Sequence, residues 1–113
     1  MEAINQIGHY QLENLVMQRV NFTLIDLTLE CDILEQFKHL SPYYHSFLKS
    51  QIHKATLSDF RANPLFSGLA KESPIVFVCD HGIDSKKIAD NLEKENYINV
   101  FYLAGGSTSI KNN

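Results

Sequence analysis

The residue with the most distinctive chemistry in this sequence is Cys79, which directly follows the apolar run Ile75–Val78. Apolar β-branched and aromatic residues after Pro74 are typical of a short strand buried on both faces, as in a parallel sheet. A tight loop follows, in which Gly82 can adopt backbone angles that other residues avoid, and helical spacing then begins with Ile88. Loop amides and a helix amino terminus beyond a strand stabilise negative charge. The pattern therefore predicts a nucleophilic thiolate, against the alternative of a buried structural cysteine.

Two carboxylates in the same loop, Asp80 and Asp84, oppose this thiolate. A carboxylate about 4 Å from a thiolate costs about 4 kcal/mol at an effective dielectric constant of about 20. If the loop amides point inward, the carboxylates point outward, where water reduces each repulsion to about 1 kcal/mol. Amide hydrogen bonds to an anion, at about 1.5 to 3 kcal/mol each, then outweigh that cost. We expect a reactive Cys79 that attracts dianions poorly.

Other polar residues near the loop have two open interpretations. Lys86 and Lys87 either steer an anion inward or form a solvated helix face, and His81 either donates a hydrogen bond to sulfur or is an exposed loop residue. We favour a strand-end role for Asp26, as an acceptor that ties loops together, over a catalytic role. For Cys31 we favour an inert thiol over one that resolves an intermediate.

The elements that must position these groups alternate between strands and helices. The pattern predicts strands over residues 4–7, 22–27, 55–57, 75–78 and 99–104, and helices over residues 10–20, 29–40, 64–70 and 85–95. Residues 41–54 fit either a short helix or a packed loop, and Asn96 fits a left-handed helix stop. This order predicts an α/β fold with a parallel sheet and helices on both faces. Asp26 and Thr28 then share the sheet edge of Cys79.

Composition narrows the classes of function. The 113 residues are enough for one domain, 1–113, and a formal net charge of −3 gives no reason to expect nucleic acid or an anionic membrane as a partner. No apolar run approaches a membrane span and no secretion signal is recognisable, so we expect a cytoplasmic protein. Two cysteines without a CxxC pair exclude a thioredoxin-type motif. The histidines lack ligand spacing, so we expect no metal and no cofactor.

A family resemblance rests on residues 75–85, IVFVCDHGIDS in sequence, and on further positions toward the carboxyl end. Those positions are Ala89, Leu92, Tyr97, Asn99-Val100 and Leu103 to Gly106. Together they resemble the carboxyl half of a rhodanese-like domain, in the style of the single-domain bacterial thiosulfate sulfurtransferases. The resemblance implies a five-stranded, mostly parallel sheet flanked by helices on both faces, with the catalytic cysteine in the loop after the fourth strand.

The same resemblance implies an activity. Cys79 would take sulfane sulfur from thiosulfate or another persulfide or polysulfide donor, and pass it to a thiol or cyanide acceptor, including a protein acceptor. The substrate-binding loop would consist of Asp80, His81, Gly82, Ile83, Asp84 and Ser85. Asp26, Thr28 and Lys86 would lie in the surroundings of the site. Neither a metal nor a cofactor is implied.

The sequence departs from the family pattern at three places. Thr28 stands where an arginine is usual, Ser50-Gln51 stands where a Gly-His pair is usual, and no tryptophan follows Gly105-Gly106. These departures keep a second hypothesis open, namely a catalytically weak or inactive module that binds a partner or senses a ligand.

A cysteine phosphatase is a further alternative with a testable requirement. Such an enzyme needs an arginine six positions after the nucleophile, since a guanidinium binds a tetrahedral oxyanion with two hydrogen bonds. That position holds Ser85, and the two arginines of the chain, Arg19 and Arg61, lie outside the loop. The sequence therefore argues against phosphate monoester chemistry.

Overall fold

Strands and helices alternate along the chain in the computed structural model, which describes residues 6–29, 33–56, 59–62, 66, 68–80 and 82–103. The strands are β1 Gln6–Ile7, β2 Thr23–Asp26, β3 Ile52–Lys54, β4 Ile75–Val78 and β5 Val100–Leu103. The helices are α1 His9–Met17, α2 Ile33–Gln36, α3 Pro42–Gln51 and α5 Ile83–Lys94, with a 3₁₀ turn η1 at Phe60–Ala62.

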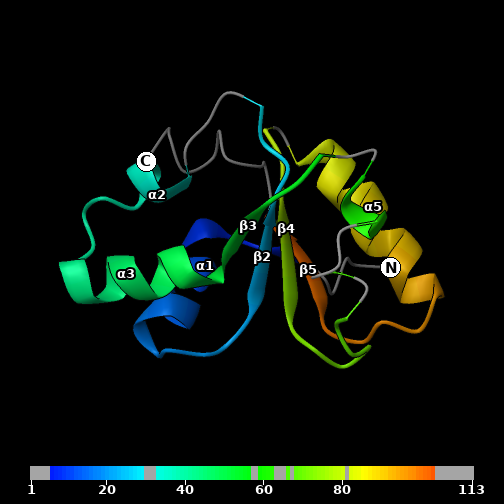
Figure 1. Ribbon diagram of the computed structural model, residues 1–113, viewed down its shortest axis with the longest axis horizontal. Helices are drawn as coiled ribbons and strands as arrows, with labels where there is room; N and C mark the ends of the chain where they lie inside the picture. Colours follow the sequence, from blue (N-terminus) through cyan, green and yellow to red (C-terminus); the bar gives the residue numbers. More distant parts are fainter. Residues whose placement is uncertain are drawn as a thin grey trace.

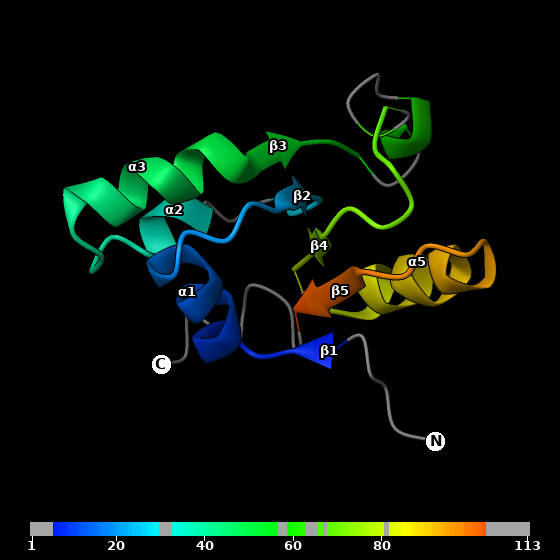
Figure 2. The same cartoon turned by 90° about the horizontal axis from the view of Figure 1, so that it is seen from below.

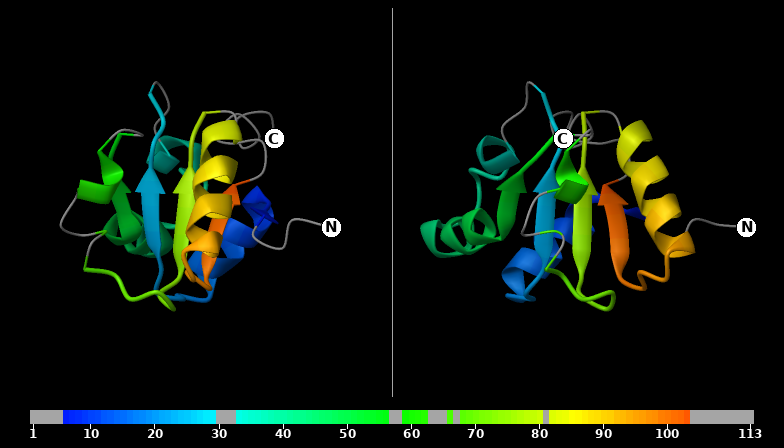
Figure 3. Two further views of the ribbon diagram at one scale, coloured as in Figure 1. Left: turned by 90° about the vertical axis from the view of Figure 1, so that its right-hand side faces the viewer. Right: turned by 45° about the vertical axis from the view of Figure 1, so that its right-hand side comes forward.

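The five strands form one parallel sheet in the order β1-β5-β4-β2-β3. All four residues of the central strand β4 are 0% exposed, because helices cover both of its faces. Figure 3 shows the arrows of β2, β4 and β5 pointing in one direction, with the start of α5 beyond the tip of β4. The predicted α/β fold with helices on both faces is confirmed.

Side-chain alternation along the strands separates two hydrophobic clusters. Leu24, Val76 and Val78 face the cluster that contains residues of α1, α2 and α3, including Leu12 and Leu48. The intervening residues face a second cluster, formed with η1 and α5; they are Ile25, Leu27, Ile75, Phe77 and Cys79. Figures 1 and 2 both show α1, α2 and α3 on one side of the sheet and α5 on the other. Cys79 therefore continues the inward pattern of Ile75 and Phe77 on the α5 face.

Two helix ends use left-handed residues that are not glycine. After α1, Arg19 has φ of 55° and the amide of Val20 donates to the carbonyl of Leu15 at 3.0 Å, which closes the helix with a bond across six residues. After α5, Asn96 has φ of 75°, so the predicted left-handed stop is confirmed. Asparagine tolerates this conformation better than most residues, since its short polar side chain interacts locally with the backbone.

Two predicted elements were wrong in position. The third strand covers Ile52–Lys54 instead of 55–57, because α3 runs directly into it and Ile52 pairs with Leu24 of β2. Within the range 29–40, where one helix was predicted, the described residues form only the short helix α2. The amides after α2 bond to carbonyls three residues back, as the amide of Phe37 does to the carbonyl of Leu34, which is the pattern of a tighter 3₁₀ turn. Residues 41–54 contain α3 and β3.

Other predicted features lie outside the described residues. They are Cys31, His81, Gly105-Gly106, and most of the predicted helix over 64–70. No helix in the described part of the chain has the length and apolar composition needed to cross a bilayer.

Candidate active site around Cys79

The order of the strands reverses between the neighbouring strands β2 and β4. From β2 the chain continues outward to β3, whereas from β4 it continues to β5 on the opposite side. Loops therefore diverge from the carboxyl ends of these neighbouring strands and leave a crevice, which is the usual ligand site of open α/β sheets. The amide of Leu27 donates to the carbonyl of Val78 at 2.8 Å, and this bond holds the two strand ends together. Cys79 is the next residue after Val78.

Two backbone amides point at the sulfur of Cys79. The N–H of Gly82 lies 3.0 Å and that of Ser85 3.4 Å from Sγ. Gly82 has φ of 86°, a left-handed conformation that turns the loop into the first turn of α5. The positive end of the helix dipole therefore lies at the sulfur, and both amides stabilise a thiolate there. The sequence-based expectation of inward-facing loop amides agrees with this geometry.

Cys79 is buried, but it lines an open pocket of about 460 Å³. The other lining residues, which we call with Cys79 the Cys79 pocket, are Leu27, Leu29, Thr56, Asp80, Ile83 and Asp84. Leu29 and Ile83 are 85% and 63% exposed. The described lining residues include no lysine or arginine, so the pocket presents carboxylates and apolar groups to an incoming molecule.

The two loop aspartates have different roles. Asp84 is exposed in the first turn of α5, where the helix dipole stabilises a negatively charged carboxylate. Asp80 is half-buried, and its Oδ2 accepts a hydrogen bond from the amide of Leu29 at 3.1 Å. Its Oδ1 is buried without a partner among the described residues. The expectation that both carboxylates point into water was therefore wrong for Asp80, which ties the loop after β2 to the loop of Cys79.

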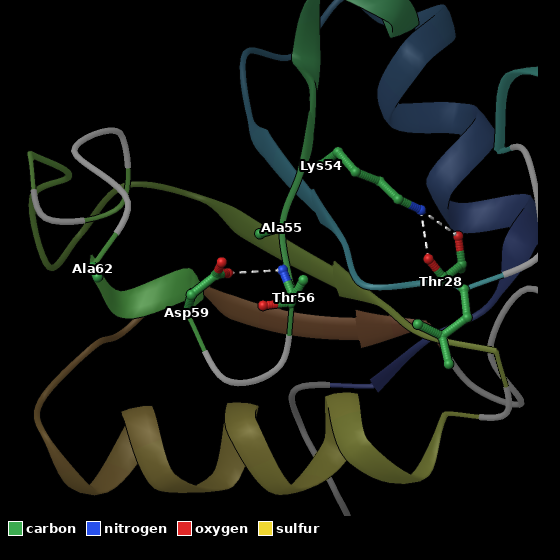
Figure 4. A pocket seen from close by; sticks show the side chains of 7 residues that line it. Thr28, Lys54, Ala55, Thr56, Asp59 and Ala62 are labelled. Atoms are coloured by element: carbon green, nitrogen blue, oxygen red, sulfur yellow. Dashed lines mark hydrogen bonds between the residues drawn. The ribbon is translucent and has the colours of Figure 1, made fainter.

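Asp26 lies on the sheet face opposite to Cys79, because it follows Leu24 by two residues and Leu24 packs against α1 and α3. Its Oδ1 accepts bonds from the amide and hydroxyl of Thr28 at 2.9 and 2.6 Å. The ammonium of Lys54 donates to Thr28 Oγ1 at 3.1 Å and to the Thr28 carbonyl (Figure 4). The same ammonium lies 3.5 Å from Asp26 Oδ2. The favoured strand-end role of Asp26 agrees with this geometry.

Lys54 was not singled out by the sequence analysis. The register of β2 and β3 would have identified Lys54, since Asp26 and Lys54 are partners in this parallel strand pair. That register was missed because the third strand was predicted three residues too late.

Two further predicted site residues do not contact the pocket. Lys86 is exposed and its ammonium binds the carboxylate of Asp90 at 3.1 Å, which raises the pKa of Lys86. Ser85 is 0% exposed, and its hydroxyl has no hydrogen-bond partner among the described residues. Ser85 therefore reaches the site through its amide. Within the described residues, no three acidic, histidine or cysteine side chains gather to hold a metal ion.

A comparison with protein families bears directly on this arrangement. The sequence profile of the Rhodanese-like domain family matches residues 12–113. The chain belongs to the rhodanese-like domain family. A comparison with curated protein sequences gave no match.

Solved structures share the rhodanese-like fold at low sequence identity. A rhodanese-like domain protein from Staphylococcus aureus is 17% identical, with a TM-score of 0.65 and coverage of 95% of this chain and 91% of that one. The human single-domain sulfurtransferase TSTD1 is 15% identical, with a TM-score of 0.62 and coverage of 97% of each chain. A protein of unknown function from Rhodopseudomonas palustris, described as a possible tyrosine phosphatase, is 16% identical, with a TM-score of 0.63 and coverage of 96% and 80%. At this identity the likeness shows the fold alone.

The Lys54 contacts predict a stability effect for this rhodanese-like domain. Lys54→Met leaves the buried Asp26 carboxylate without its cation, and we expect a loss of about 1 to 2 kcal/mol, since the lysine itself is half-exposed. Urea unfolding measures the loss. Lys38→Met is the matched control: it breaks the surface pair with Glu35 and should cost less than about 0.5 kcal/mol. Equal losses in both variants would contradict a structural role for Lys54.

The backbone of Gly82 predicts an effect on reactivity. In Gly82→Ala, the left-handed φ costs about 1 kcal/mol or more, and relief of that strain turns the amide away from Sγ. Loss of one amide bond to an anionic sulfur lowers its reactivity about 10- to 100-fold. Stopped-flow alkylation of Cys79 at neutral pH measures this. Gly68→Ala, outside the pocket lining, is the control, and unchanged alkylation in Gly82→Ala would contradict the role of this amide.

Proposed function

We propose that this rhodanese-like domain is a sulfurtransferase in which Cys79 carries sulfane sulfur as a persulfide. The observation that carries the proposal is the position of Sγ, which accepts amide bonds from Gly82 and Ser85 and lines an open pocket. A thiolate held by backbone amides is a ready nucleophile, and its pocket leaves room for an outer sulfur and the group attached to it. The family and the single-domain sulfurtransferase among its structural neighbours support the same assignment.

The chemistry has two balanced steps. In the first, the Cys79 thiolate attacks the outer sulfur of a donor and a bond from Sγ to that sulfur forms. The bond from that sulfur to the rest of the donor breaks, and the remainder leaves as sulfite, as a thiolate or as a polysulfide one sulfur shorter. In the second, an acceptor thiolate or cyanide attacks the same outer sulfur and Sγ leaves as a thiolate. Amide hydrogens at Sγ stabilise the negative charge that returns to it in this second step. No outside oxidant or reductant is needed.

Phosphate ester chemistry has less support, although one structural neighbour is described as a possible tyrosine phosphatase. Position 85 contributes a serine amide where such an enzyme needs a guanidinium. The described lining residues add two carboxylates and no cation, which disfavours a phosphate dianion.

A binding or sensing module without turnover is the second candidate. The observation in its favour is the pair of carboxylates, Asp80 and Asp84, that lines the Cys79 pocket and repels the thiosulfate dianion. The module would still hold a reactive sulfur, so the two candidates differ in whether sulfur leaves Cys79 after loading.

Mass spectrometry tests the proposal. The protein is incubated separately with thiosulfate and with inorganic polysulfide, and then digested without reductant. We expect one added sulfur on the peptide that contains Cys79, and its removal by cyanide with release of thiocyanate. Absence of added sulfur with both donors would overturn the proposal, whereas loading without release would favour the module.

A further inference from the structure

A second pocket adjoins the Cys79 pocket. It has a volume of about 500 Å³ and shares Leu29 and Thr56 with its neighbour. Its remaining described lining residues are Thr28, Lys54, Ala55, Asp59 and Ala62. Figure 4 shows this second pocket between the end of β3 and the turn η1, with Lys54 directed at Thr28 and Asp59 directed at the amide of Thr56. The space at the sulfur thus continues past Leu29 and Thr56.

The size of this space argues against a small inorganic partner. Pockets of about 300 to 1,000 Å³ hold ligands with the bulk of an organic molecule. Each of the two pockets falls in that range. A small ion at Cys79 leaves the second pocket empty, whereas an extended chain can fill both while its sulfur reaches Sγ.

The charge of the two pockets selects the chemistry of the occupant. Hydrogen bonds from the hydroxyl and amide of Thr56 lower the pKa of Asp59, so this carboxylate is ionised. Asp80 and Asp84 add two further carboxylates. Lys54 is the one cation among the described lining residues, and its ammonium already binds Thr28 and Asp26. Such a surface favours a positively charged partner.

Apolar groups extend beyond the pockets. Leu29 and Ile83 expose 85% and 63% of their surface on the rim of the Cys79 pocket, and Ala55 and Ala62 line the second pocket. Only a partner wider than the pocket can bury large apolar side chains on its rim. A low-molecular-weight thiol is too small to do so. A protein surface meets this condition.

We propose that the sulfur acceptor of Cys79 is a cysteine on an extended segment of another protein, flanked by basic and apolar residues. This inference rests on the proposed sulfurtransferase function and names its second substrate. The acceptor thiolate attacks the outer sulfur of the Cys79 persulfide, the bond from that sulfur to Sγ breaks, and the acceptor becomes the persulfide. The basic residues lie against Asp59, Asp80 and Asp84, and the apolar residues lie against Leu29 and Ile83.

Single-turnover transfer tests this inference. The protein is first loaded with inorganic polysulfide, excess donor is removed, and loss of sulfur from Cys79 is followed by mass spectrometry. The acceptors are a cysteine peptide with lysine and leucine flanks, the same peptide with glutamate in place of lysine, and free cysteine. We expect the lysine peptide to react at least about 10-fold faster than either of the others at low salt, and the preference to shrink in about 0.5 M NaCl.

Three variants locate the contact. Asp84→Arg and Asp59→Asn should each reduce the preference for the lysine peptide several-fold, and asparagine keeps an oxygen that accepts the Thr56 amide. Leu29→Ser should slow the lysine peptide several-fold more than it slows free cysteine. Glu93→Arg is the matched control, compared with Asp84→Arg at about 0.15 M ionic strength. Glu93 is exposed near the far end of the same helix, about 14 Å along its axis from Asp84, and the Debye length in that buffer is about 8 Å. We expect it to behave as the unmodified protein.

The outcomes separate the two proposals. If polysulfide never loads Cys79, the sulfurtransferase proposal fails. If loading succeeds but all three acceptors react equally, or if free cysteine reacts fastest, the protein-acceptor inference fails and the sulfurtransferase stands. An equal effect of Glu93→Arg and Asp84→Arg would also overturn it, because the preference would then reflect net charge alone.

Discussion

In Cys79→Ser, we expect no sulfur loading by polysulfide and a fall in cyanolysis of about 10³-fold or more, because removal of a covalent nucleophile eliminates the intermediate itself. Serine nearly preserves the size of the side chain, and its hydroxyl can still accept the amide bonds of Gly82 and Ser85. A hydroxyl at neutral pH is a far weaker nucleophile than a thiolate and forms no persulfide. Release of thiocyanate from cyanide measures the loss.

Two controls support this first prediction. Thermal unfolding of Cys79→Ser should remain cooperative, since the substitution removes no large part of the core. Cys31→Ser removes the other cysteine of the chain and should retain loading and turnover. If Cys79→Ser loads sulfur, or if Cys31→Ser loses loading instead, then Cys79 is not the sulfur carrier.

The Asp84→Arg variant should gain thiosulfate turnover. Asp84 is exposed on the wall of the Cys79 pocket, and the substitution changes the local charge by two units. For a dianion about 6 Å away in water, Coulomb's law gives about 3 kcal/mol before screening. We therefore expect kcat/KM for thiosulfate to rise about 100-fold at low salt and about 10-fold at physiological ionic strength. Replacing the favourable Asp84 carboxylate with an arginine in the first turn of α5 costs about 1 kcal/mol against the helix dipole.

The salt dependence makes the second prediction specific. Glu93→Arg changes the net charge equally, and at physiological ionic strength we expect less than about a twofold gain in kcat/KM, because the Debye length of about 8 Å isolates this position from the pocket. Asp84→Ala should lie between the original protein and Asp84→Arg. If Asp84→Arg fails to turn over thiosulfate although Cys79 loads with polysulfide, repulsion is not the barrier, and the reading as a binding or sensing module gains support.

The local pattern around the central strand was readable from the sequence because it depends on neighbours in the chain. Apolar residues on both faces indicated a buried parallel strand at Ile75–Val78, and Gly82 marked the turn into α5. The distance from Cys79 to the amides of Gly82 and Ser85 follows from these same few residues. The left-handed stop at Asn96 is equally local.

Contacts between distant segments were not readable in this way. Asp80 was expected in water, but the loop after β2 brings the amide of Leu29 to its carboxylate, across 51 positions in the chain. The third strand was misplaced, because the helical pattern of α3 ends where strand pairing with β2 begins, and only pairing fixes that boundary.

The sequence by itself pointed to Cys79 and its loop and predicted the parallel α/β sheet, since these depend on residue type and short-range periodicity. Tertiary structure decided which side chains surround Cys79. Strand alternation placed Asp26 on the sheet face opposite to Cys79, and the register of β2 and β3 brought Asp26 to Lys54. The diverging loops of β2 and β4 opened the pocket at Cys79. Strand order and register set these placements through long-range pairing, which no single stretch of the chain encodes.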